Sequence, residues 1–100
     1  MMTVGMNYRV RDGKGDAFEK KFKLVVDSMG SMQGGHLQTS LFRDTDKPAR
    51  YLVVSEWETD EDFHRFIDSQ TFRDVTAWGA EHILSERPTH EIFERRPLTR

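Results

Sequence analysis

Apolar and polar side chains alternate along several stretches of this chain, and such alternation is the period of a strand with one buried face. In residues 3–11 the apolar side chains fall on one face, whereas Asn7 falls on the other. Residues 50–58 carry apolar side chains on both faces, so we expect a central strand that is covered on both sides. Strands are predicted at residues 3–11, 36–44, 50–58 and 89–96.

Apolar side chains at helical spacing follow the first predicted strand. After a turn at residues 12–16, a stripe with spacings of four, three and four is formed by Phe18, Phe22, Val25 and Met29. The stripe predicts a helix that runs to about Ser28. Asp16 is its expected N-cap, with Glu19 three residues later as the second member of a capping box.

A second helical region follows the third predicted strand. Thr59 is the expected N-cap, and three acidic residues fill the first turn, where the helix dipole favours negative charge. Phe63 and Phe66 mark its buried face. Helical spacing then resumes and ends at the sequence "ERP"; the residues that keep this spacing are Phe72, Val75, Gly79 and His82.

The expected order of elements is β-α-β-β-α-β, which is the α+β arrangement of ferredoxin-like domains with a four-stranded antiparallel sheet. Such a sheet carries its helices on one face and leaves the other face to be covered. Because the third predicted strand is apolar on both faces, we expect a second copy of the chain to cover the open face. A length of 100 residues fits a single domain spanning residues 1–100.

Composition narrows the class of partners. The net charge is -2 and the pI is about 6.1, so no global field attracts nucleic acid or an anionic membrane. No apolar run approaches the roughly 18 residues needed to span a bilayer. Cysteine is absent, which excludes disulfides and thiolate chemistry. The first residues lack the pattern of a signal peptide, and we expect a cytoplasmic protein.

Few residues follow a recognisable catalytic pattern. No metal-ligand spacing connects the four histidines, which are His36, His64, His82 and His90. The chain has neither the nucleophile elbow of serine hydrolases nor a phosphate-binding loop. An asparagine inside a strand is uncommon, so Asn7 is either a polar site residue or a residue on a wet face. Trp57 and Trp78 are expected in the core or in a ligand pocket.

Several stretches resemble the antibiotic-biosynthesis-monooxygenase domain, and among its members the heme-degrading monooxygenases most closely. These stretches are the strand "YLVVSEWE", the acidic cap "TDEDF", the segment "SQTFRDV" and the closing "ILSERPTHEIFE". The resemblance covers nearly the whole chain. It implies ferredoxin-like subunits that pair through their sheets into a dimeric α/β barrel, with a cleft between the sheet and the helices of each subunit.

The resemblance also implies three catalytic positions. Heme-degrading members carry an asparagine on the first strand, a tryptophan on the helix after the "W-E" strand, and an axial histidine nine or ten residues later. These positions fall on Asn7, Phe66 and Thr76. Threonine supplies no imidazole for iron, and His82, about one and a half turns further along, is either an alternative ligand or a partner of the helix dipole.

Three functions stay open at this point. The resemblance implies a cofactor-independent monooxygenase that oxidises an aromatic or quinol-type molecule with O2, with Asn7 donating a hydrogen bond to the substrate. Its expected substrate-binding residues are Tyr8, Ser55, Phe63, Phe72, Trp78 and His82. The alternatives are a heme-binding or heme-degrading protein with altered ligation, and a non-catalytic dimeric ligand-binding module. A cavity of ligand size between Asn7, Phe66 and Thr76 would support catalysis.

Overall fold

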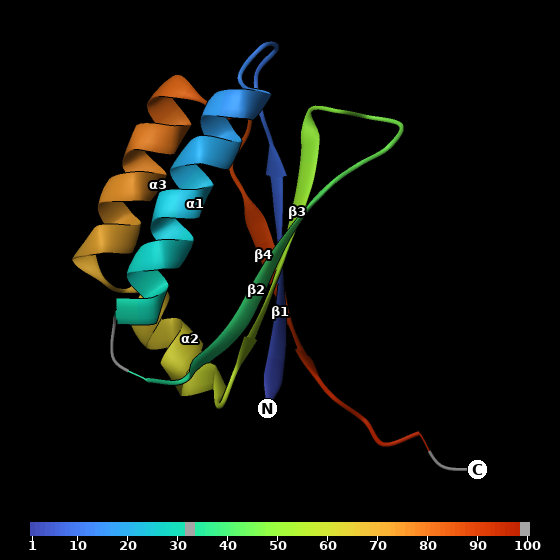
Figure 1. Ribbon diagram of the computed structural model, residues 1–100, viewed down its shortest axis with the longest axis vertical. Coiled ribbons are helices and arrows are strands. Elements are labelled where there is room, and N and C mark those ends of the chain that lie inside the picture. Colours follow the sequence, from blue (N-terminus) through green and yellow to red (C-terminus); the bar gives the residue numbers. More distant parts are fainter. Residues whose placement is uncertain (32–33, 99–100) are drawn as a thin grey trace.

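A computed structural model describes residues 1–31 and 34–98 of the chain. Within these residues it has four strands and three helices in the expected order (Figure 1). The elements are β1 (Met2–Arg9), α1 (Gly15–Ser31), β2 (His36–Arg43), β3 (Arg50–Trp57), α2 (Asp60–Ile67), α3 (Gln70–His82) and β4 (Thr89–Glu94). The strands form one antiparallel sheet in the order β2-β3-β1-β4, which confirms the ferredoxin-like fold.

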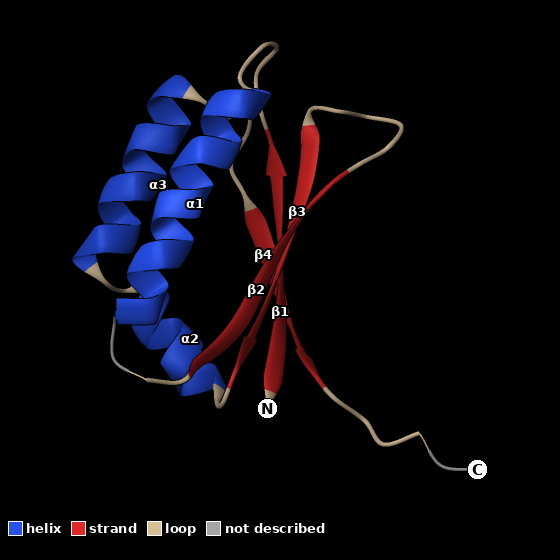
Figure 2. Ribbon diagram, in the orientation of Figure 1, coloured by secondary structure: helices blue, strands red, loops and turns tan. Residues whose placement is uncertain are grey.

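The molecule has two layers, and the three helices cover one face of the sheet (Figure 2). β3 pairs with β1 on one side and with β2 on the other, which confirms its central position. Because side chains alternate along a strand, Val4 and Met6 of β1 both point toward the helices, where they are buried. On β3 the same face carries Tyr51 and Val53, which are each 1% exposed.

α1 begins at Gly15, so Asp16 lies inside its first turn and not at the N-cap. The predicted partner Glu19 serves a different purpose, because its carboxylate accepts a hydrogen bond from the Tyr51 hydroxyl at 2.5 Å. Burial, reinforced by this carboxylate, raises the pKa of Tyr51 to about 12. The expected capping box is therefore replaced by a bond between α1 and β3. The helix also runs to Ser31, three residues beyond the expected end.

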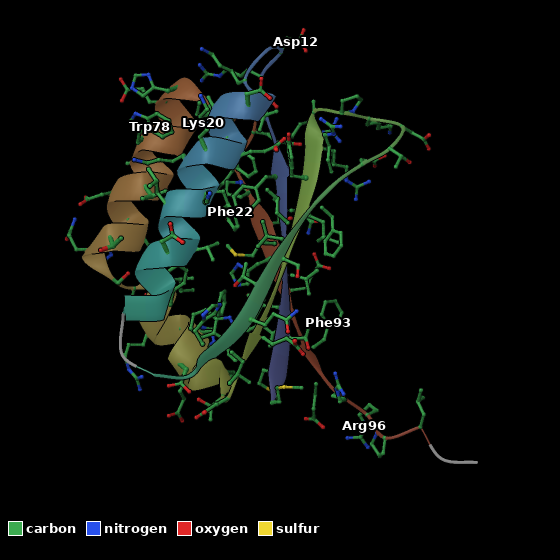
Figure 3. The ribbon with its side chains drawn as sticks, viewed as in Figure 1. Asp12, Lys20, Phe22, Trp78, Phe93 and Arg96 are labelled. Carbon is green, nitrogen blue, oxygen red and sulfur yellow. The ribbon has the colours of Figure 1, made fainter. Side chains whose placement is uncertain are left out.

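Phe18, Phe22 and Val25 are buried against the sheet, as their spacing predicts. Phe22 points from α1 toward the sheet in Figure 3. The side chain of Met29, the fourth member of the expected stripe, lies outside the described residues. The stripe thus confirms the face of α1 that forms the core.

The start of α2 confirms Thr59 as its N-cap, because the Thr59 hydroxyl accepts a hydrogen bond from the backbone N–H of Asp62. The same hydroxyl donates to the Asp62 carboxylate at 2.9 Å, which lowers the pKa of Asp62. Gly35 packs against this carboxylate with a φ of 105°, and a Cβ at Gly35 would overlap with it. Only glycine fits there, so the approach to β2 is tied to the start of α2.

α3 begins after Ser69, whose hydroxyl accepts a hydrogen bond from the Phe72 N–H. It ends at His82, and the following Leu84 forms an isolated bridge with Val10 beyond the end of β1. None of the described helices is both long and apolar enough to cross a membrane.

The second face of the sheet carries several exposed apolar side chains. Phe42 and Phe93 are each 52% exposed, and Leu52 is 39% exposed. Figure 3 shows Phe93 on the side of the sheet that faces away from the helices. Gly5 lies between Phe93 and Leu52, because a Cβ at Gly5 would lie 3.7 Å from the Phe93 ring and 3.8 Å from Leu52. This apolar area, made of Phe42, Leu52, Val54 and Phe93, is called the open sheet face below.

Candidate functional site

A groove of about 660 Å³ runs along α3 and the segment that leads from α3 to β4. Apolar side chains form its floor, among them Ile67, Phe72, Leu84 and Pro88. Its rim carries the guanidinium groups of Arg11, Arg73 and Arg87 and the carboxylate of Glu86. A groove of this size with an apolar floor and a few polar groups has the general character of a small-molecule site.

A smaller apolar cavity of about 60 Å³ lies between α1, α3 and the sheet. It is where the expected cleft between the sheet and the helices remains open. Its lining includes Tyr8, Phe18, Phe22, Val75, Trp78 and Gly79. A cavity this small cannot hold an aromatic substrate, and its walls are almost entirely apolar.

The groove and the cavity share a wall made of Phe72, Thr76, Leu84 and Pro88. Thr76 is the only hydroxyl-bearing residue in this wall. Its hydroxyl donates to the backbone oxygen of Phe72 at 2.7 Å, so its oxygen keeps acceptor capacity on the wall. The two hollows therefore adjoin each other on the helix side of the molecule, on either side of this wall.

The three expected catalytic positions are not brought together. Asn7 lies on the face of β1 opposite the helices, where its side-chain amide donates to Glu91 at 2.8 Å. Since Thr76 lies on α3, the sheet separates the two residues. Strand alternation is the reason, because Met6 and Tyr8 take the helix-facing positions on either side of Asn7. Asn7 instead lines a polar hollow with Arg50, Thr89 and Glu91 among others.

Phe66 is buried in the aromatic core and lines neither the groove nor the cavity. Its ring centroid lies 5.5 Å from that of Trp57 and 5.0 Å from that of Phe72. Phe63 is fully buried, with its ring 5.7 Å from Trp57. The Trp57 indole N–H donates to the hydroxyl of Ser55 at 2.9 Å. Phe63 and Phe66 are therefore core residues, and the Ser55 hydroxyl is buried beneath Trp57.

Three of the expected substrate-binding residues line the cavity, namely Tyr8, Phe72 and Trp78. Tyr8 lines it, and burial raises the pKa of the Tyr8 hydroxyl well above its usual value. Trp78 (Figure 3) lies at its outer edge and is 37% exposed. The Lys21 ammonium lies 4.9 Å from the centre of its ring. His82 is exposed at the end of α3 beside Glu81 and lines neither hollow. Phe72 alone of the expected substrate-binding residues borders both hollows.

The arginines of the groove were not predicted as site residues. They come from three separate segments, the turn after β1, the first part of α3, and the connection to β4. No spacing rule connects them, and only the fold brings them to one rim. The described residues contain no group of three or more histidine, aspartate or glutamate side chains that could hold a metal ion.

Comparisons with known proteins agree with this architecture. A solved structure of an antibiotic biosynthesis monooxygenase superposes with a TM-score of 0.82 at 15% identity, covering 97% of this chain and 100% of that one. SnoaB from Streptomyces nogalater, a cofactor-independent oxygenase, gives a TM-score of 0.80 at 22% identity over 97% of this chain and 94% of its own. At these identities the likeness shows a shared fold.

Sequence comparison finds a relative in Halobacterium salinarum that is named as a putative heme-binding protein. It is 31% identical over 88 residues, which are 88% of this chain and 18% of the relative. A protein of the same description from Haloarcula marismortui is 32% identical over 88 residues, which are 13% of its length. The chain therefore spans less than a fifth of these relatives. The sequence profile described as antibiotic biosynthesis monooxygenase matches residues 1–78, and the chain belongs to that family.

Proposed function

We propose that this protein is an oxygenase that oxidises an aromatic, quinol-type small molecule with O2 and without a metal or flavin cofactor. The observation that carries the proposal is the wall shared by the groove and the cavity, made of Phe72, Thr76, Leu84 and Pro88. The groove has the volume of an aromatic ligand, and the cavity has the size and apolar lining that suit O2. The substrate and the oxidant would meet at this wall.

The chemistry needs little from the protein beyond binding and electrostatics. The deprotonated substrate gives one electron to O2, and the resulting radical and superoxide combine to form a carbon–oxygen bond. Loss of water from the peroxide leaves a carbonyl, so that the ring CH2 group of an anthrone and O2 become C=O and H2O. A simple quinol would instead lose two electrons and two protons to O2 and give the quinone and H2O2. The protein would align the two reactants, exclude bulk water and favour the anionic form of the substrate.

Gly79 supports a use for the cavity. Glycine inside a helix destabilises it by about 1 kcal/mol relative to alanine. A methyl group at Gly79 would meet Leu84 at 3.8 Å, which is an ordinary contact, so packing does not require glycine there. Because Gly79 has no methyl group, part of the cavity stays open. This fits a role for that space in holding a small apolar molecule.

The proposal is tested by measuring O2 uptake and absorbance across a panel of quinols and anthrones. We expect at least one compound to be oxidised faster than it reacts without protein. Ala77 is exposed on α3 and lines the groove, so Ala77→Phe should obstruct it and lower the rate at least tenfold. Glu81→Phe adds the same ring to the same helix outside both hollows and should leave the rate unchanged. Flat traces throughout would refute the oxygenase proposal.

Heme is the second ligand to consider, because two relatives are named for heme binding. The described lining of the groove and of the cavity contains no histidine, cysteine or methionine, and its tyrosine, Tyr8, lines only the cavity of about 60 Å³, which is far too small for heme. Thr76 stands at the position of the axial histidine, and its hydroxyl is bonded to the backbone of α3. These residues do not fit an iron centre with the usual ligands, so no step of the proposed reaction uses one.

Titration with heme is accordingly expected to give no Soret shift of the kind that histidine ligation produces. His82→Ala should leave the spectrum unchanged, and His64→Ala, which removes another exposed histidine from α2, is the matched control. A histidine-type shift that disappears only in the His82 variant would contradict this expectation and favour altered heme ligation.

We further propose that two copies of the chain pair through the open sheet face. Its exposed phenylalanines and leucine form a contiguous apolar area, and contiguous apolar areas on a protein surface mark interaction sites. Pairing would cover β3 on both faces, as its sequence pattern predicts. The groove lies on the helix side, so pairing through the sheets would leave it accessible.

A further inference from the structure

The groove carries an excess of positive charge on a chain that is negative overall. Three arginines line it, and the only carboxylate among its lining residues is that of Glu86. The Glu86 carboxylate is already 2.8 Å from Nε of Arg9, an arginine outside the groove. The net charge of the chain is -2, so this local excess is not a reflection of composition.

Arg11 is held in place by the backbone around the end of α3. Its Nε donates to the carbonyl oxygen of Leu84 at 2.9 Å, and one terminal nitrogen donates to that of Ala80 at 3.2 Å. An arginine has five N–H donors, so these two bonds leave others for a ligand. The guanidinium is therefore fixed at one end of the groove before any ligand arrives.

Arg73 and Arg87 are exposed on the rim, one on α3 and the other on the segment before β4. Among residues 1–31 and 34–98, neither side chain has an ion pair with a carboxylate. A guanidinium binds a carboxylate through two parallel N–H···O bonds, a geometry that an ammonium does not offer. Both arginines are thus available for a ligand that carries such a group.

We propose that the groove binds its substrate as a carboxylate, with an apolar ring system on the floor and the acid group between Arg73 and Arg87. Arg11 adds a fixed positive charge at the end of the groove. The proposal rests on the proposed function, whose substrate class it narrows from quinol-type aromatics to those that also carry a carboxylate. It is a statement about binding, so it can be tested without turnover.

Fluorescence titration with anthracene-9-carboxylate and with its neutral analogue 9-anthracenemethanol tests the charge requirement. We expect the carboxylate to bind at least tenfold more tightly and its affinity to fall as salt is raised. Arg73→Gln and Arg87→Gln should each weaken carboxylate binding about tenfold and leave binding of the alcohol unchanged. Arg96→Gln, which removes an exposed arginine of the C-terminal segment, should change neither affinity.

Equal affinity for the acid and the alcohol, or unchanged affinity in both groove variants, would overturn the proposal. Tighter binding of 1-naphthyl phosphate than of 1-naphthoate would replace the carboxylate by a phosphate. Because the measurement uses no O2 consumption, carboxylate binding without oxidation would refute only the oxygenase function. Oxidation of neutral quinols with no preference for acids would refute only the carboxylate assignment. Circular dichroism of each variant verifies that its fold is intact.

Discussion

Replacing Phe63 by alanine is expected to lower the free energy of unfolding by about 3–5 kcal/mol. The Phe63 side chain is fully buried and is the point at which α2 enters the core. The centroid of its ring lies 5.7 Å from that of Trp57 and 5.4 Å from that of His90, and both ring pairs are edge-on. Alanine would leave a cavity that these rings cannot fill without moving. Domains of this size are stable by only about 5–15 kcal/mol, so the loss is a large share of the total.

The measurement is urea unfolding followed by tryptophan fluorescence, because Trp57 lies against the substituted ring. His64→Ala is the matched control, since His64 is the next residue on α2 and is exposed. It should change stability by no more than about 0.5 kcal/mol. A loss below about 1 kcal/mol for Phe63→Ala would mean that α2 is not anchored by this side chain.

Strand alternation in the sequence located the faces of the sheet correctly, and Asn7 shows how far that information reached. Its place in the alternation assigns it to the face opposite Val4 and Met6, and the structure confirms this. The family resemblance pointed to the same residue as catalytic, with a cleft on the helix side. The two inferences conflict, because one side chain cannot lie on both faces of a strand. A catalytic role for Asn7 stays a prediction without support from its position.

Long-range contacts explain what the sequence did not predict. Glu19 has the spacing of a capping-box residue, yet it accepts a hydrogen bond from Tyr51, which is 32 positions away. A buried hydroxyl requires a hydrogen-bond partner. Glu19 supplies that partner to Tyr51 and does not form the capping-box hydrogen bond at the start of α1. The groove arginines are a similar case. Arg11 and Arg73 are far apart in the sequence and share no motif. They line one groove because the fold places the end of β1 near the end of α3, and the groove runs along that helix.

Phe66 and Gly79 together show how this chain divides the space between its sheet and its helices. Phe66 fills one part of it with an aromatic cluster around Trp57, whereas Gly79 leaves a small cavity in another part. The space that remains is too small for a polycyclic ligand. Under the proposed function, a substrate would therefore bind in the outer groove, with only a small molecule such as O2 in the cavity behind it. Phe66 and Thr76 stand where the resemblance to heme-degrading members implies tryptophan and histidine, and this division of space fits the proposed oxygenase chemistry instead.

Leu52→Glu is expected to convert a dimeric protein into a monomer. Leu52 lies on the open sheet face beside Gly5 and pairs across the strands with Phe42. In a symmetric pair each copy would bury one leucine, so the variant would bury two carboxylates in an apolar contact. Leaving such charges unpaired costs at least about 3 kcal/mol, which corresponds to a roughly hundredfold weaker association.

Sedimentation at tens of micromolar measures the effect, with the wild type expected at twice the 11.7 kDa of the chain. Leu24→Glu is the matched control, because Leu24 is 62% exposed on α1, away from the open sheet face. It should leave the dimer intact, whereas Leu52→Glu should sediment as a monomer with unchanged circular dichroism. A monomeric wild type would exclude pairing, and a Leu52 variant that stays dimeric would move the interface elsewhere. Since the groove lies on the other side of the sheet, a folded Leu52→Glu monomer should still bind the groove ligand, which separates assembly from binding.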